Sequence, residues 1–412
     1  MRRPPPPPAP SAPRDLRRDP ATWTRVARAV LWPLAVGSLV HLVVRSATGT
    51  APDLEILWRG GARLAAGEPL YDPLREFIYP PVAGWLLAPL GLLSFRTAVV
   101  VVVVGGLLAV VAATVLLLRQ VGVRGDSAVL PAVLLALAHS RPLAGLLHQG
   151  NIDTVLLLAE AGVIALLLAR RDLAAGALLG AVCAIKPTLA PVALALVVLG
   201  RGRALLAAVV SGGVLSALGL LTVPDRGTFF TDVLPLLAGG NREVLIPYNR
   251  SIHGAAVELG LPVSLDTVLR VAAFGAACWI AWRRRSAPLA PLEVVPVLML
   301  GTLLASSFTW ANYSIYLLPL LVTVALPGGL VRSWPAWAGV YLFATADAWH
   351  IEDLDELPDT LLRLLPLWGW LLLLGACAVN AYRSGRAVRA QAPTLTAEPA
   401  PHAAAATSHR AA

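Results

Sequence analysis

Hydrophobic and polar positions divide the chain into long apolar segments joined by short polar connectors. The first apolar segment runs roughly from Ala27 to Val44, and a polar stretch from Thr50 to Pro81 follows it. Twelve further apolar segments follow, beginning with Pro80–Leu93, and several are shorter than the ~20 residues that a crossing helix needs. We therefore predict an all-α, polytopic membrane protein with about ten to thirteen transmembrane helices, the short ones being broken or half helices around a cavity.

The polar stretch has a pattern of its own, because Asp53 to Ala66 reads as a short amphipathic helix. Such a helix lies in the membrane interface and does not span it. Gly67 ends it, and Tyr79-Pro80-Pro81 opens the next segment, since proline is tolerated in a first helical turn. The apolar side of this helix would consist of Leu54, Leu57, Trp58, Ala62 and Leu64, with Glu55, Arg59 and Arg63 opposite.

Composition supports the membrane class. The chain is 57% hydrophobic and 14% charged, with a mean hydropathy of +0.71. Its net charge of +9 lies in tails and short loops without a basic face, so it reads as a membrane-orientation signal and not as a nucleic-acid site. The three cysteines lie far apart in apolar runs and suggest neither a metal site nor a disulfide. With 32 arginines and one lysine, the chain is typical of a GC-rich, actinobacterial genome.

The positive charges also predict the orientation. Residues 1–26 are rich in proline and arginine and are expected to form a disordered cytoplasmic tail, since seven arginines precede Val30. Residues 27–382 would then form the transmembrane domain of a multi-pass plasma-membrane protein, with 47–79 as its first external loop and 383–412 as a second disordered cytoplasmic tail. Alternation places the basic Arg119–Asp126 connector outside, so either a nearby segment does not cross or the rule is locally broken. The crossings between residues 173 and 200 also stay open.

Lys186 is the only lysine and lies within a long apolar stretch. A charge in hydrocarbon is costly, so a membrane-embedded lysine normally faces a cavity or a partner, and Pro187 would break the helix beside it. The alternative is a loop between two short helices from which the lysine reaches the surface. We favour a functional role, because a cytoplasmic loop of this chain would be expected to carry arginine.

Two other polar groups stand out. His148-Gln149-Gly150-Asn151-Ile152-Asp153 precedes a long apolar segment, and Asn151 or Asp153 can cap that helix, although four such side chains exceed what a cap requires. The external region Asp225–Leu261 contains Asn249-Arg250-Ser251-Ile252-His253 and is paired with Ser306–Trp310. Arg250 and His253 could hold a phosphate or sugar hydroxyls. Equally, a polar external loop needs no ligand.

The order and spacing of these motifs resemble glycosyltransferase family 87, whose members have the GT-C fold. They are polyprenol-phosphate-dependent, chiefly actinobacterial α-mannosyltransferases and arabinofuranosyltransferases of the cell envelope. The matching motifs are Asp53 after the first span, Gly67-x-Pro69-Leu70-Tyr71-Asp72, Tyr79-Pro80-Pro81, Ala88-Pro89-Leu90, the HQGN segment, Ala175-Gly176-x-x-x-Gly180 with Lys186-Pro187, and Asn249-x-Ser251.

The chain departs from the family pattern at two places. The family's S-P-x-S-W-x-H-H stretch ends here in Asn312-Tyr313 instead of a histidine pair, and glycine and glutamine are rearranged in HQGN. Any donor contact that the histidines make is therefore in question, and the reaction class transfers better than the sugar.

The resemblance implies an inverting transfer of a sugar, with mannose favoured, from a polyprenyl-phosphate donor to an envelope lipid or glycan at the outer face. Asp53 would be the general base, and Lys186 and Arg250 would bind the donor phosphate. We expect no metal and no cofactor. An arabinofuranosyltransferase of the same family is the alternative; a transporter or flippase is a rival class, against which the absence of an inverted repeat and the long external loops argue. The substrate cavity would include Tyr71, Tyr79, Gln149, Asn151, Asn249, Ser251, His253 and Trp310.

Overall fold

The computed structural model describes residues 20–71, 77–235, 248–346 and 356–391, and these ranges contain helices and turns but no strand. Most residues of the two tails that were predicted to be disordered fall outside these described ranges. The first helix begins at Pro20 and the last continues to Gln391, so helix extends into both predicted tails, and the domain boundaries stay a prediction. Both helices have more residues than a bilayer requires, so their ends extend as helix beyond the apolar segment.

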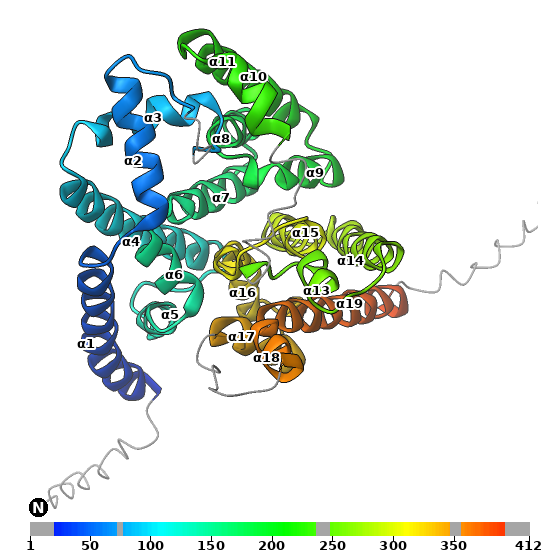
Figure 1. Cartoon of the computed structure of the whole chain (residues 1–412). Helices are drawn as coiled ribbons and strands as arrows, with labels where there is room; N and C mark the ends of the chain where they lie inside the picture. The colour runs from blue at the N-terminus through cyan, green and yellow to red at the C-terminus, as the bar shows by residue number, and fades with distance from the viewer. Residues whose placement is uncertain (1–19, 72–76, 236–247, 347–355, 392–412) are drawn as a thin grey trace, which may run out of the picture.

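The described helices fall into two successive groups, which Figure 1 colours from blue to green and from green to red. The first group contains α1 (Pro20–Ala47), α2 (Pro52–Ala65), α3 (Pro81–Gly91), α4 (Phe95–Gln120), α5 (Val129–Ala138), α6 (Arg141–Gln149), α7 (Asp153–Leu168), α8 (Asp172–Ile185), η2 (Pro187–Leu189), α9 (Pro191–Val198), α10 (Gly202–Thr222), α11 (Arg226–Thr228) and η3 (Phe229–Val233). The second contains α13 (Ile252–Glu258), α14 (Val263–Arg284), α15 (Pro291–Ala305), η5 (Ala311–Leu317), α16 (Leu318–Leu321), η6 (Val322–Ala325), α17 (Trp334–Ala344), α18 (Glu356–Arg363) and α19 (Leu365–Gln391).

Five helices of the described ranges are long and apolar enough to cross a membrane by themselves: most of α1, α4, α10, α14 and most of α19. A sixth crossing forms if α5 and α6, which meet at a bend of 60°, are taken as one broken span. The other apolar helices have 10–17 residues, as the short apolar segments of the sequence indicated. The protein is therefore an all-α polytopic membrane protein, and the count of ten to thirteen crossings stays a prediction.

The helix α3 has 11 residues, fewer than the ~20 that a crossing helix needs, and so falls among the short segments for which broken or half helices were expected. The guanidinium of Arg96, at the start of α4, donates to the backbone oxygens of Ala47 (3.2 Å) and Gly49 (3.4 Å), at the end of α1. The chain from α1 to α4 thus leaves and returns at the same end of the molecule. The Arg119–Asp126 connector follows the opposite end of α4. A topology in which α3 does not cross would place this connector on the predicted cytoplasmic side, in agreement with the charge rule.

The helix α3 packs along α2 to form a helical hairpin. A Cβ on Gly61 would lie 2.5 Å from the carbonyl oxygen of Leu87, so only glycine lets the two backbones come this close. The indole of Trp58 on α2 donates to the backbone oxygen of Leu93 (3.0 Å) and so holds the segment that follows α3 against α2. The bounds of α2 agree with the amphipathic helix expected at Asp53–Ala66, and Leu54, Leu57 and Leu64 are buried as expected.

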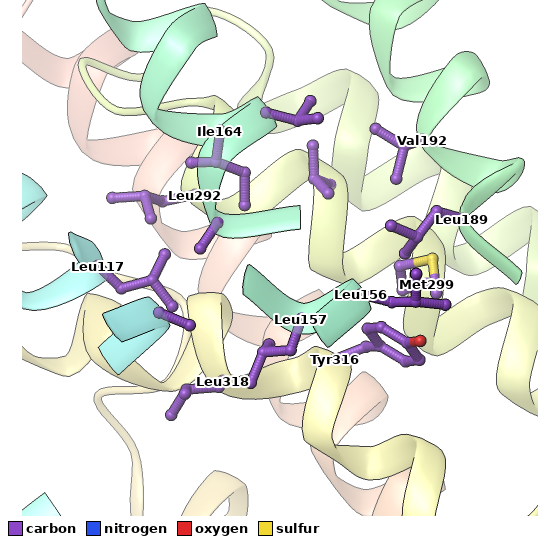
Figure 2. Close-up of a cluster of buried hydrophobic side chains, with 14 of the residues drawn as sticks. Leu117, Leu156, Leu157, Ile164, Leu189, Val192, Leu292, Met299, Tyr316 and Leu318 are labelled. Carbon is purple, nitrogen blue, oxygen red and sulfur yellow. The ribbon is translucent and has the colours of Figure 1, made fainter. Parts of the chain in front are cut away.

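The two groups of helices meet in a continuous apolar core around α7 and α15. Figure 2 shows side chains from α4, α7, η2, α9, α15, η5 and α16 gathered in one cluster, with the Tyr316 ring at its lower right. Close packing of this kind holds membrane helices together where lipid is as apolar as the protein. Labelled members of the cluster are Leu117, Leu156, Leu157, Ile164, Leu189, Val192, Leu292, Met299, Tyr316 and Leu318.

Candidate active site

Asp53 lies in the first turn of α2, two residues after the left-handed residue Ala51 (φ 47°). A carboxylate at this position is stabilised by the positive end of the helix dipole. The start of α2 abuts the end of α6 at Gly150, which has φ 66° and on which a Cβ would lie 2.6 Å from Cβ of Leu54. Gly150 is therefore required both for its backbone conformation and for the close approach of Asp53 to the HQGN segment.

Asn151 holds the Asp53 carboxylate. Its amide Nδ2 donates to Oδ2 of Asp53 at 2.7 Å, and its Oδ1 accepts from the backbone N–H of Asp153 at 2.9 Å. Asn151 is buried, so both ends of its side chain are used and its orientation is fixed. The structure thus brings Asp53 and Asn151 together, and Asn151 contacts the carboxylate of the predicted base.

Lys186 forms an ion pair with Asp153, a partner that sequence reasoning treated only as a possible helix cap. Its Nζ lies 2.8 Å and 2.9 Å from the two carboxylate oxygens of Asp153, whose Oδ1 also accepts from the hydroxyl of Tyr316 at 2.8 Å. Lys186 has extended backbone (φ −148°, ψ 111°) between α8 and η2, so Pro187 does break the helix there. The lysine is directed into the protein and not towards the surface.

Two tyrosine rings flank the lysine ammonium. The ring centroid of Tyr79 lies 5.5 Å from Nζ of Lys186, and that of Tyr313 lies 5.3 Å away. Both distances are within the range of cation–π attraction. Asn312, the other residue that replaces the family's histidine pair, donates from Nδ2 to Oε1 of Gln149 at 2.7 Å. Both replacements therefore face the group of residues around Asp53.

Burial raises the pKa of Asp53 above its ordinary value, while the hydrogen bond from Asn151 and the positive charge of Lys186 lower it in part. Its carboxylate is consequently a stronger base than that of an exposed aspartate. Burial also raises the pKa of the Tyr79 phenol, so this ring stays neutral beside the lysine.

Tyr71 lies at the edge of this group. Its hydroxyl donates to the backbone oxygen of Tyr79 at 3.0 Å. Asp225, which sequence analysis did not single out, accepts the backbone N–H groups of Leu70 (2.9 Å) and Tyr71 (2.6 Å). The only sequence signal for Asp225 is a carboxylate directly after the apolar α10.

The remaining predicted residues form a second group, around the 306–310 segment. The side chain of Asn249 donates to the oxygen of Ser307 (2.8 Å) and accepts from the N–H of Thr309 (3.0 Å). Ser251 caps α13 through the N–H of Gly254 (3.1 Å). Asn249 and Ser251 are buried, and their side chains hold the loop together.

The charged and aromatic members of the second group have protein neighbours. The Nδ1 atom of His253 lies 2.8 Å from a carboxylate oxygen of Asp266, and the Trp310 ring stacks on Tyr248 at 5.5 Å. The backbone N–H of Arg250 donates to Thr309 (2.8 Å), and its charge acts on the buried Glu258. This group adjoins the first along the chain, because η5 begins directly after Trp310.

An apolar groove of about 620 Å³ has Ile185 in its wall. It lies between α3, α8 and α10, and Ile185 is the residue that precedes Lys186 in the chain. Val82 and Trp85 of α3 form one side, while Ala181 of α8 and Leu215 of α10 also line the groove. A hydrocarbon chain would meet almost only apolar side chains there.

A helical membrane fold that holds a carboxylate, an embedded lysine and an apolar groove is the arrangement expected of a membrane enzyme with a membrane-associated substrate. Residues 77–307 match the family model of glycosyltransferase family 87. An α-(1→3)-arabinofuranosyltransferase of Mycobacterium tuberculosis is 33% identical over 86% of this chain and 84% of its own length. The protein of the same name from Mycolicibacterium smegmatis is 30% identical over 86% of this chain and 85% of its own length.

A more distant relative is the polyprenol-phosphate-mannose-dependent α-(1-2)-phosphatidylinositol pentamannoside mannosyltransferase of Mycobacterium tuberculosis. It is 28% identical over 79% of each chain. The chain therefore belongs to glycosyltransferase family 87, as its motifs indicated, and it is a glycosyltransferase acting on a membrane-associated substrate. The transporter alternative is set aside.

Proposed function

We propose that the protein transfers an arabinofuranosyl unit from a polyprenyl-phosphate donor to a lipid or glycan acceptor at the outer face of the plasma membrane. Two relatives with 33% and 30% identity are named α-(1→3)-arabinofuranosyltransferases, which favours arabinose over the mannose expected from the sequence. The name of the mannosyltransferase supports a polyprenyl-phosphate donor. The basic N-terminal tail supports the orientation.

The observation that carries the mechanism is the Asp53 carboxylate, which Asn151 orients at 2.7 Å. Among the described residues no other hydrogen bond to the Asp53 side chain is seen, so its Oδ1 can accept the proton of an acceptor hydroxyl. The hydroxyl oxygen then bonds to the anomeric carbon as the bond from that carbon to the phosphate oxygen breaks. The electron pair of that bond leaves with the lipid phosphate, and the configuration inverts.

The phosphate would approach Lys186 from the side of Tyr79 and Tyr313. Because Asp153 already neutralises the ammonium in the protein alone, the lysine would share its charge between Asp153 and the donor phosphate. This arrangement keeps the lysine ionised at membrane depth before the donor arrives. Arg250 stays a second candidate for the phosphate. The residues Tyr71, Gln149, Asn249, Ser251, His253 and Trp310 would shape the cavity, and transfer would need neither metal nor cofactor.

The polyprenyl chain of the donor would occupy the groove between α3, α8 and α10. Ile185, the residue before Lys186, lines the groove, so a donor with its phosphate at Lys186 would direct its first isoprene units towards this wall. Apolar burial along the groove would then supply donor affinity, roughly 25 cal/mol per Å² of apolar surface.

The test is transfer by the purified, lipid-reconstituted protein from radiolabelled polyprenyl-phosphate arabinose, with polyprenyl-phosphate mannose in parallel. Asp53→Asn should lower turnover by about 10²–10⁴-fold, since the amide keeps the shape but loses the basic oxygen. Glu55→Gln is the matched control, because Glu55 pairs with Arg59 in its own helix (2.5 Å) and should be dispensable.

Near-normal turnover of Asp53→Asn would remove Asp53 from the mechanism and make Glu55 the next candidate. Transfer of mannose but not arabinose would instead leave the mechanism in place and reverse the choice of sugar.

A further inference from the structure

Asp225 uses its carboxylate in an unusual way for a residue that precedes a helix. An aspartate in this position commonly caps the helix that follows, yet α11 has no side-chain cap. Both oxygens of Asp225 instead accept backbone N–H groups about 155 residues away along the chain, from Leu70 at 2.9 Å and Tyr71 at 2.6 Å. Hydrogen bonds to an ionised carboxylate are stronger than those between neutral groups, so this contact strongly constrains the 70–71 segment.

The constraint continues to the lysine. Tyr71 is buried, and its hydroxyl donates to the backbone oxygen of Tyr79 at 3.0 Å. The ring of Tyr79 in turn lies 5.5 Å from Nζ of Lys186. Asp225, Tyr71, Tyr79 and Lys186 thus form an unbroken series of contacts from the end of α10 to the embedded ammonium.

Asp225 is not needed merely to attach the α2–α3 hairpin to α10. The indole of Trp85 on α3 already donates to the hydroxyl of Thr222 on α10 at 2.7 Å. Leu70 also packs against Gly84 of α3, where an added Cβ would lie 2.9 Å from the leucine side chain. The hydrogen bonds of Asp225 act only on the backbone of residues 70 and 71. Tyr71 is the residue whose side chain contacts Tyr79.

We propose that Asp225 is a positioning residue for the donor site: by holding the backbone of Tyr71, it keeps Tyr79 over Lys186 on the side from which the donor phosphate approaches. This inference rests on the proposed function, because it takes the donor to bind at Lys186. Asp225 itself touches neither substrate nor the reacting atoms. Its loss should weaken donor binding and leave the chemistry of Asp53 largely unchanged.

The experiment is a double-mutant cycle of Asp225→Ala and Tyr71→Phe, with kcat and the donor KM measured on reconstituted protein. Tyr71→Phe removes the hydroxyl but keeps the N–H that bonds to Asp225. Each single variant should raise the donor KM by roughly five- to tenfold, as expected for the loss of one or two hydrogen bonds, with kcat changed less than about twofold. The double variant should be no worse than Asp225→Ala alone, because both act through one series of contacts.

Two further variants sharpen the result. Asp225→Asn keeps one acceptor oxygen and should lie between wild type and Asp225→Ala. Asp126→Ala is the matched control, because that exposed carboxylate pairs with Arg124 two residues away (3.2 Å) and should leave KM unchanged.

If Asp225→Ala lowers the maximal rate at unchanged KM, Asp225 only maintains the amount of folded protein. If the effects of Asp225→Ala and Tyr71→Phe on KM multiply in the double variant, the two residues act independently. Either result overturns the inference. If wild type binds radiolabelled donor without transferring its sugar, the proposed function fails while the same cycle, measured on the dissociation constant, still decides the role of Asp225. If wild type neither binds nor transfers donor, both proposals fail.

Discussion

Two buried ion pairs, Lys186–Asp153 and Arg284–Glu293, have similar geometry and different surroundings. The Lys186 and Asp153 side chains are 10% and 0% exposed, and those of Arg284 and Glu293 are 15% and 2% exposed. The arginine pair joins the end of α14 to the start of α15 and also bonds the backbone of Gly328 and Leu330. The lysine pair connects α7 to the break after α8 and is linked through Asn151 to Asp53.

Burial alone therefore does not distinguish a functional ion pair from a structural one. The planar guanidinium of Arg284 divides its donors between a carboxylate and a loop carbonyl, which suits a residue that fastens loops. The compact ammonium of Lys186 faces two tyrosine rings and lies beside an apolar groove. The chemical neighbours of each pair indicate its role, and the comparison predicts that the two pairs respond differently to neutralisation.

The largest effect should come from neutralising each pair completely. Removing one partner of a buried pair costs about 3–5 kcal/mol of stability, whereas replacing both partners with neutral residues is often tolerated. Lys186→Met should therefore lower both stability and transfer. Lys186→Met combined with Asp153→Asn should recover the thermal unfolding temperature but not donor binding or turnover.

The matched experiment at the other pair is Arg284→Met combined with Glu293→Gln, which should recover stability and transfer together. Recovery of full transfer in the doubly neutral Lys186 and Asp153 variant would break the comparison. The lysine pair would then be structural like the arginine pair, and the donor phosphate would need another partner, with Arg250 the first to examine.

A second, smaller effect concerns the groove beside Lys186. Ala181→Phe should fill part of the groove and raise the KM of a long-chain donor roughly tenfold, since about 1.4 kcal/mol of apolar burial would be lost. A donor shortened to one or two isoprene units should be affected little. Val209→Phe, on the exposed face of α10, is the control. Equal effects on long and short donors would show that the polyprenyl chain lies elsewhere.

Short-range patterns were sufficient to predict the elements that carry Asp53. The amphipathic repeat from Asp53 to Ala66 corresponds to α2 within one residue at each end, because an interfacial helix buries one face and exposes the other. The break at Lys186-Pro187 was likewise predictable, since proline removes a helical hydrogen bond.

Contacts between distant segments could not be predicted in this way. Lys186 pairs with a residue 33 positions away, and Asp225 with an N–H group about 155 positions away. Hydropathy marked α3 as a short apolar segment but did not record that α4 starts again beside Ala47. Asn249 and Ser251 were predicted to line the substrate cavity, but the sequence did not show that the Asn249 side chain bonds the backbone of the distant 306–310 segment while Ser251 caps α13.

The smallest expected effect concerns Asn151, which links the lysine pair to Asp53 and has no counterpart at the arginine pair described above. Burial raises the pKa of Asp53, and the Asn151 hydrogen bond lowers it in part by stabilising the carboxylate. As the proposed base, Asp53 can take a proton only when it is ionised, so transfer should fall as the pH drops through its raised pKa. Asn151→Ala removes the stabilising bond, so the acid limb of kcat/KM should move to higher pH. Arg284→Met is the control, because it alters the arginine pair and not the Asp53 contact. In the folded fraction of this variant, the acid limb of kcat/KM should stay at the same pH. An unmoved limb in Asn151→Ala would mean that another group controls the acid side of the profile.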